Sequence, residues 1–171
     1  MSITFFHRAF RMVLLLAVQL LVMNHIHLFG YGTPLLLAGL TLKFHRGTSR
    51  ISLLLWGFVM GMFYDMFSNT TGMGMATCTL LSMMQPFLLN LFTPREASAE
   101  LRPSFLTIGQ INYILYVLLT MLIFHAVFYA LDAFTISNWI LTLTGISTGT
   151  LIATMLMVLF DLISHPKRHE S

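Results

Sequence analysis

Long apolar runs dominate this sequence and decide what it can fold into. A bilayer core about 30 Å thick is crossed by roughly 20 apolar residues at 1.5 Å per residue. Four such runs are clear, over residues 12–29, 51–67, 71–92 and 108–131, and a fifth covers 136–163 with only isolated polar residues. Because the 171 residues are 57% apolar and only 9% charged, the charges cannot cover a water-facing surface. The sequence therefore predicts an all-α polytopic membrane protein and excludes a soluble enzyme or binding domain.

The segment over residues 31–44 is harder to assign. Its 14 residues would make about 21 Å of helix, which fits either a short tilted span or a re-entrant piece. If the segment crosses, all nine cationic residues fall on one side of the membrane, as the positive-inside rule requires. If it is re-entrant, they are split between both faces. The nine are Arg8, Arg11, Lys43, Arg46, Arg50, Arg95, Arg102, Lys167 and Arg168.

We therefore expect a single integral membrane domain over residues 1–171, with both termini in the cytoplasm. Its six transmembrane helices are expected over residues 12–29, 31–44, 51–67, 71–92, 108–131 and 136–163. The outer loops are short and free of Lys and Arg. The longest loop, over residues 93–107, carries charges of both signs and is expected to be solvated on the cytoplasmic side.

Several kinds of chemistry have no basis in this sequence. The single cysteine, Cys78, lies in an apolar run, so no disulfide within the chain is expected. The cations are scattered and form no basic patch, which argues against a nucleic-acid partner. No Gly-x-Ser-x-Gly, His-Glu-x-x-His or phosphate-binding glycine loop is present, so we expect neither an enzyme nor a cofactor.

A stripe of small residues marks the third expected span. Gly57, Gly61 and Asp65 are spaced by four, which places them on one helix face. Small residues at this spacing let two helix backbones approach closely in lipid, so the stripe predicts a helix-contact face. A generic packing stripe explains the glycines equally well. The candidate partners of the carboxylate on the outer side are His25, His27, His125, the backbone amides of the turn through Gly72, and polar groups of another protein.

A metal site on the outer side is not expected. His25 and His27 are two residues apart and point to different faces of a regular helix, while His125 belongs to another helix. No His-x-x-x-His or paired-carboxylate spacing supports a metal cage.

The sixth expected span carries a second packing face, formed by Gly145, Gly149 and Ala153 at a spacing of four. The same spacing continues to Asp161 at the cytoplasmic end, where a solvated or ion-paired carboxylate is expected. Because the third span runs outward and the sixth inward, Asp65 and Asp161 are expected at opposite depths, so they do not form a proton relay.

Gly57 and Gly61, followed by Asp65 and Gly72 with Phe63 and Tyr64 before the aspartate, resemble the signature segment of MreD, the rod shape-determining membrane protein family. The first outer turn, from Asn24 to Pro34, resembles the version found in Bacteroidota. This resemblance implies a non-enzymatic subunit of the cell-elongation machinery for peptidoglycan in the bacterial inner membrane. The implied partners are MreC, MreB, RodA and a class B penicillin-binding transpeptidase.

Within that family, we expect the glycine face of the third span to receive the membrane anchor of MreC, with Asp65 fixing the depth of the anchor. The family fold is similar to the six-helix substrate-binding subunits of energy-coupling-factor vitamin transporters. A transporter subunit with a ligand pocket opening to the outside is therefore the main alternative. A binder of lipid or of the undecaprenyl carrier is a third.

Overall fold

The computed structural model describes residues 10, 12–14, 16–19, 36–70, 72–94, 96–133 and 139–164. Within these residues all regular structure is helical, which confirms the expected all-α class. Four helices are long and apolar enough to cross a membrane: α3 (Arg50–Ser68), α4 (Met73–Phe92), α6 (Gln110–Ala133) and α7 (Trp139–Ser164). Two short helices, α2 (Ala38–Leu42) and α5 (Phe105–Ile108), accompany them. Residues 12–14 and 16–19 are also helical, whereas 20–29 of the first expected span lie outside the described residues.

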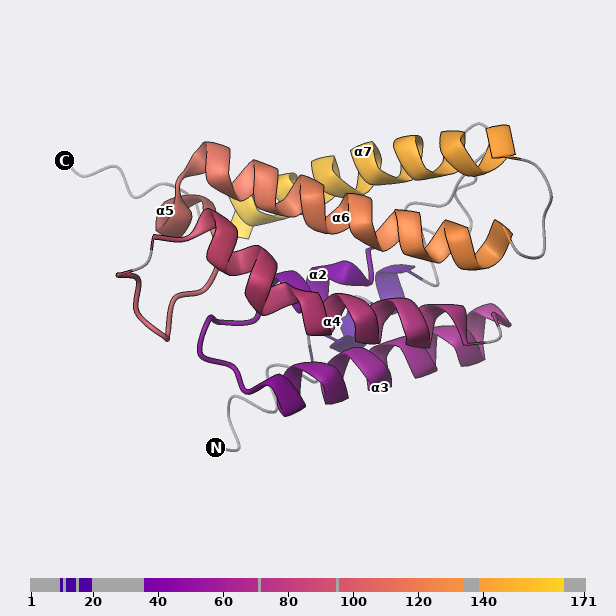
Figure 1. Cartoon of the computed structure of the whole chain (residues 1–171), viewed down its shortest axis with the longest axis horizontal. Helices are drawn as coiled ribbons and strands as arrows, with labels where there is room; N and C mark the ends of the chain where they lie inside the picture. Colours follow the sequence, from indigo (N-terminus) through magenta and orange to yellow (C-terminus); the bar gives the residue numbers. More distant parts are fainter. Residues whose placement is uncertain are drawn as a thin grey trace.

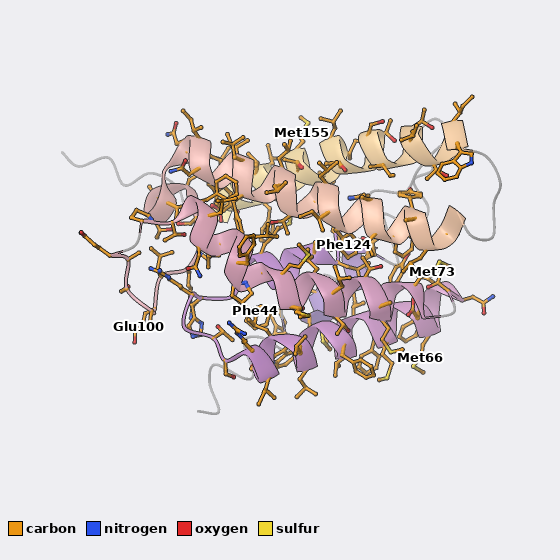
Figure 2. All side chains as sticks on the ribbon, viewed as in Figure 1. Phe44, Met66, Met73, Glu100, Phe124 and Met155 are labelled. Carbon is orange, nitrogen blue, oxygen red and sulfur yellow. The ribbon has the colours of Figure 1, made fainter. Side chains whose placement is uncertain are left out.

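The long helices pack in the order α3, α4, α6, α7, with α2 against α3, α4 and α6 (Figure 1). Successive long helices run in opposite directions. The loops before α3 and after α4, with α5 and the last turn of α7, therefore lie at one end of the bundle. Phe124 is fully buried between α6 and α4, while Met66 and Met155 point away from the bundle on opposite sides (Figure 2). The apolar outer surface is what a bundle surrounded by lipid requires.

Polar caps and a turn set the ends of α3 and α4. The Ser49 hydroxyl accepts a hydrogen bond from the Ser52 backbone nitrogen at 3.4 Å and so caps the start of α3. Asn69, at the end of α3, has a left-handed backbone with φ 54°. Gly72, with φ 80°, precedes α4. The bounds of these two helices agree with the ranges 51–67 and 71–92 expected from the sequence to within two residues at each end.

The expectation of a continuous helix over 31–44 is wrong. Residues 31–35 lie outside the described residues, and within 36–44 only Ala38–Leu42 is helical. Five residues rise about 7.5 Å, a quarter of the bilayer core. All five are buried by surrounding helices. An apolar run satisfies burial inside protein as well as in lipid, so hydropathy alone could not separate the two.

Two loops predicted to be on the same side are joined by hydrogen bonds. The backbone nitrogen of Arg46 lies 3.0 Å from the Leu101 carbonyl oxygen, and that of Gly47 lies 2.6 Å from the Ala99 oxygen. The Arg46 guanidinium also donates to the Ala97 carbonyl oxygen at 2.8 Å. This end of the bundle, which we call the cationic end, carries every Lys and Arg among the described residues: Lys43, Arg46, Arg50 and Arg102.

Most described residues of the loop over 93–107 are exposed, as expected, but the end of the loop packs against the bundle. Its last residues form the start of α5, and Pro103 and Ser104 are buried. Gly109, with φ 85°, separates α5 from α6, so the expected span 108–131 begins two residues later. The segment folds back because the backbone nitrogen of Phe105 donates to the Asp161 carboxylate at 3.2 Å.

Candidate functional site

The glycine face of α3 is in close contact with α4 of the same chain. A Cβ atom added at Gly57 would lie 2.7 Å from the Cys78 carbonyl oxygen. One added at Gly61 would lie 2.5 Å from the Gly74 carbonyl oxygen and 2.6 Å from its carbon. Real Cβ atoms do not approach backbone so closely, so only glycine permits this helix pair. The predicted helix-contact face exists, and α4 fills it.

Asp65 holds the beginning of α4. Its Oδ1 accepts hydrogen bonds from the Gly74 backbone nitrogen at 2.8 Å and from the Thr70 hydroxyl at 2.6 Å. Its Oδ2 accepts from the Met75 backbone nitrogen at 2.8 Å. The first N–H groups of a helix have no partner within the helix, and a carboxylate there also favours the helix dipole. Of the partners considered for this carboxylate, it contacts the backbone amides just after Gly72, while His25 and His27 lie outside the described residues.

Two glycines complete the joint between α3 and α4. Gly72 has open space around its Cα and is required for its positive φ of 80°. Gly74 is required for space, since a Cβ there would lie 2.7 Å from Asp65 Oδ1 and 2.7 Å from Tyr64 Cδ1. The sequence reasoning missed Gly74, because a glycine two residues after another was assigned to the turn alone. The position of Gly74 in the sequence could have indicated this role, because it comes just after the turn, where the next helix begins opposite the glycines of α3.

This geometry corrects the mechanism expected for the glycine face. A helix of another protein cannot pack on Gly57 and Gly61 while α4 covers them. The carboxylate of Asp65 is likewise engaged with its own chain and does not present a free anchor. These residues build the bundle, and a partner helix must contact a different face.

The second predicted face joins α7 to α6. Gly145, Gly149 and Ala153 are all buried, and a Cβ at Gly149 would lie 2.6 Å from the His125 ring carbon Cδ2. His125 is fully buried on α6, and its Nδ1 lies 2.8 Å from the Met121 carbonyl oxygen. The two glycine faces therefore make two separate hairpins, α3 with α4 and α6 with α7 (Figure 1).

A buried ion pair lies at the cationic end. Asp161 is fully buried and pairs with Lys43, whose side chain is 19% exposed. Lys43 Nζ also lies 3.2 Å from the Tyr113 hydroxyl and 5.5 Å from the centre of that ring. Of the alternatives for Asp161, the ion-paired one is therefore confirmed. The partner was missed because Lys43, near the end of the helix expected over residues 31–44, is 118 residues away in sequence.

The described residues include no candidate metal site. Among them, no group of three or more His, Cys, Asp or Glu side chains could hold a metal ion. His25 and His27 lie outside the described residues.

A groove of about 830 Å³ opens at the cationic end. Its walls come from the first helical segment, α2, the α5 region and α7. The wall is mostly apolar, and its charged side chains are Lys43 and Arg102.

Comparison with protein-family models, curated proteins and solved structures found no match to this chain. The described residues define the class as a helical protein in which four helices are long and apolar enough to span a membrane.

Proposed function

We propose that this chain is a non-enzymatic, multi-pass subunit of the bacterial cell-elongation machinery in the inner membrane. In this role it scaffolds MreC and the peptidoglycan synthase, formed by RodA and a class B penicillin-binding transpeptidase, alongside MreB. The supporting observation is that the residues resembling the MreD signature converge on one structural joint. Gly61 and Asp65 both contact Gly74, two residues after Gly72, and Gly57 contacts the same helix one turn further along, so the short motif encodes one helix joint.

The proposed topology has six crossings with both termini in the cytoplasm. The cationic end supports it, since positively charged loops stay on the cytoplasmic side during insertion. A hydrogen bond between the Leu36 backbone nitrogen and Gln19 Oε1, at 2.7 Å, brings the first helical segment beside the start of α2. That contact suits the proposal, since Gln19 and Leu36 belong to the first and second expected spans, which would lie side by side.

The proposed docking faces for MreC are the outward sides of α3 and α7. On α3, Leu55, Met62 and Met66 are 61%, 37% and 70% exposed. On α7, Leu151 and Met155 are 63% and 71% exposed. Association of helices in lipid depends on packing, and flexible methionines adapt to a partner surface.

Co-purification with crosslinking tests the proposal. In a Cys78→Ala background, Met62→Cys and Met155→Cys sample the two outward faces. We expect MreC to co-purify with the wild-type chain and to crosslink through one of the two cysteines. Absence of MreC from the purified wild-type complex would contradict the proposal, and crosslinking through neither cysteine would contradict the docking faces.

The transporter alternative requires a ligand pocket on the outer side. The groove described above opens instead at the cationic end, which the proposed topology places in the cytoplasm. Mass spectrometry of the purified protein separates the two functions, since a retained vitamin-sized molecule would support the transporter.

A further inference from the structure

We propose that the groove at the cationic end binds one anionic phospholipid from the adjacent leaflet, with its phosphate at Arg102 and its acyl chains along α7. This binding site is independent of the partner proteins proposed above. It rests on a cation of the lining that no described residue neutralises, on the polar and apolar residues that line the groove, and on the size of the groove.

The charge at the rim is available to a ligand. Arg102 is exposed, and its guanidinium makes no hydrogen bond or ion pair with any residue that the structure describes. The other cation of the wall, Lys43, is already paired with the buried Asp161. Among the residues that the structure describes, Arg102 is therefore the cation of the rim without a counter-charge, and an anionic ligand complements it. Basic pockets at the cytoplasmic side of membrane helices recognise anionic head groups in this way.

The polar and apolar lining residues of the groove come largely from different elements. Ser104 and Thr107 join the two cations, and all four come from loops and short helices at the cationic end. The longer helical walls supply mostly apolar side chains. On α7, the lining from Leu156 to Ile163 extends about 10 Å along the helix axis. A head group at the rim would place its hydrocarbon against these side chains.

A lipid fits this arrangement better than a partner helix. The groove has a volume of about 830 Å³, within the range of sites that enclose small molecules. A helix about 10 Å across would need a longer open face. The Arg102 guanidinium, which no described residue pairs with, also suits one phosphate, whereas helices in lipid associate through small residues and close backbone contact.

Native mass spectrometry of the full chain in mild detergent tests the proposal. The probes are phosphatidylglycerol and phosphatidylcholine with identical acyl chains, offered together in equal amounts. We expect the wild-type protein to retain phosphatidylglycerol preferentially. Arg102→Gln should reduce that preference about fivefold, while Arg50→Gln, which removes the same charge at the same end outside the groove, should not.

A steric pair tests the acyl-chain wall separately. Leu156→Trp should fill the groove and lower retention of phosphatidylglycerol, whereas Leu151→Trp, on the outward face of the same helix, should leave it unchanged. Equal retention of the two lipids by the wild-type protein would overturn the proposal, as would equal effects of Arg102→Gln and Arg50→Gln. Displacement of phosphatidylglycerol by an equal amount of undecaprenyl phosphate or by a copurified helix would also overturn it.

Discussion

The carboxylate of Asp65, near the end of α3, accepts a hydrogen bond at 2.8 Å from the backbone nitrogen of Gly74, in the first turn of α4. One side chain thus fixes the geometry of the turn between two candidate membrane spans. The contact needs the close approach that Gly61 permits, because the same glycine of α4 lies against it.

Removal of this cap should destabilise the isolated protein. Asp65→Ala leaves the Gly74 and Met75 amides without their acceptor, and we expect a loss of about 1–2 kcal/mol in unfolding free energy. Asp65→Asn, which keeps one acceptor oxygen, should lose less. Thermal or denaturant unfolding in detergent measures both. Asp132→Ala removes a carboxylate elsewhere on the same end and is the matched control; an equal loss there would contradict the capping role.

A larger side chain on the glycine face should destabilise the isolated protein itself, and not only its complex with a partner. A side chain at Gly61 meets the backbone of Gly74, which cannot move without separating the helices, so Gly61→Ala should cost about 1–3 kcal/mol and Gly61→Leu more. Met62→Ala, one residue away on the outward face, should have little effect. Unfolding of the purified protein in the absence of MreC checks this, and wild-type stability of Gly61→Leu would refute the packing described.

Replacing one member of the ion pair at the cationic end should destabilise the protein more than replacing both members together. Asp161→Asn keeps an acceptor for the Phe105 amide but leaves Lys43 without its counter-charge. We expect each single change, Lys43→Met or Asp161→Asn, to cost about 3 kcal/mol, because the first leaves a fully buried carboxylate and the second a partly buried ammonium without its counter-charge. The double variant should recover part of that loss. A double-mutant cycle gives the coupling, and additive losses would show that the two groups act independently.

The two hairpins should differ in how they respond to changes at their glycines. Gly149→Ala places a methyl group against the His125 ring, which is a side chain and can shift, whereas Gly61→Ala meets backbone. The first variant should therefore lose less stability than the second. Unfolding measured side by side checks the order, and the reverse order would contradict the contacts assigned to α7.

Much of the helical layout follows from local sequence. The apolar runs, Ser49 before α3 and the turn through Gly72 define α3 and α4 almost to the residue. Spacing of four likewise predicted that Gly57 and Gly61 face another helix. It could not say which helix, because close approach requires the same small residues whether the partner is within the chain or outside it.

The remaining features depend on contacts between distant segments. Lys43 and Asp161 are 118 residues apart in sequence, and nothing local to either one indicates the other. The short α2 was missed for a different reason. Its apolar residues are buried by other helices, so their hydropathy equals that of a membrane span while their length in helix is far smaller.

Accessibility labelling tests the central claim that the cationic end is cytoplasmic and that this chain spans the membrane around it. In a Cys78→Ala background, Ser98→Cys reports the cationic end and Trp139→Cys the opposite end, both at exposed positions. A membrane-impermeant maleimide added to intact spheroplasts should label Trp139→Cys and leave Ser98→Cys unmodified until the membrane is opened. Labelling of Ser98→Cys from outside, with Trp139→Cys protected, would contradict the topology.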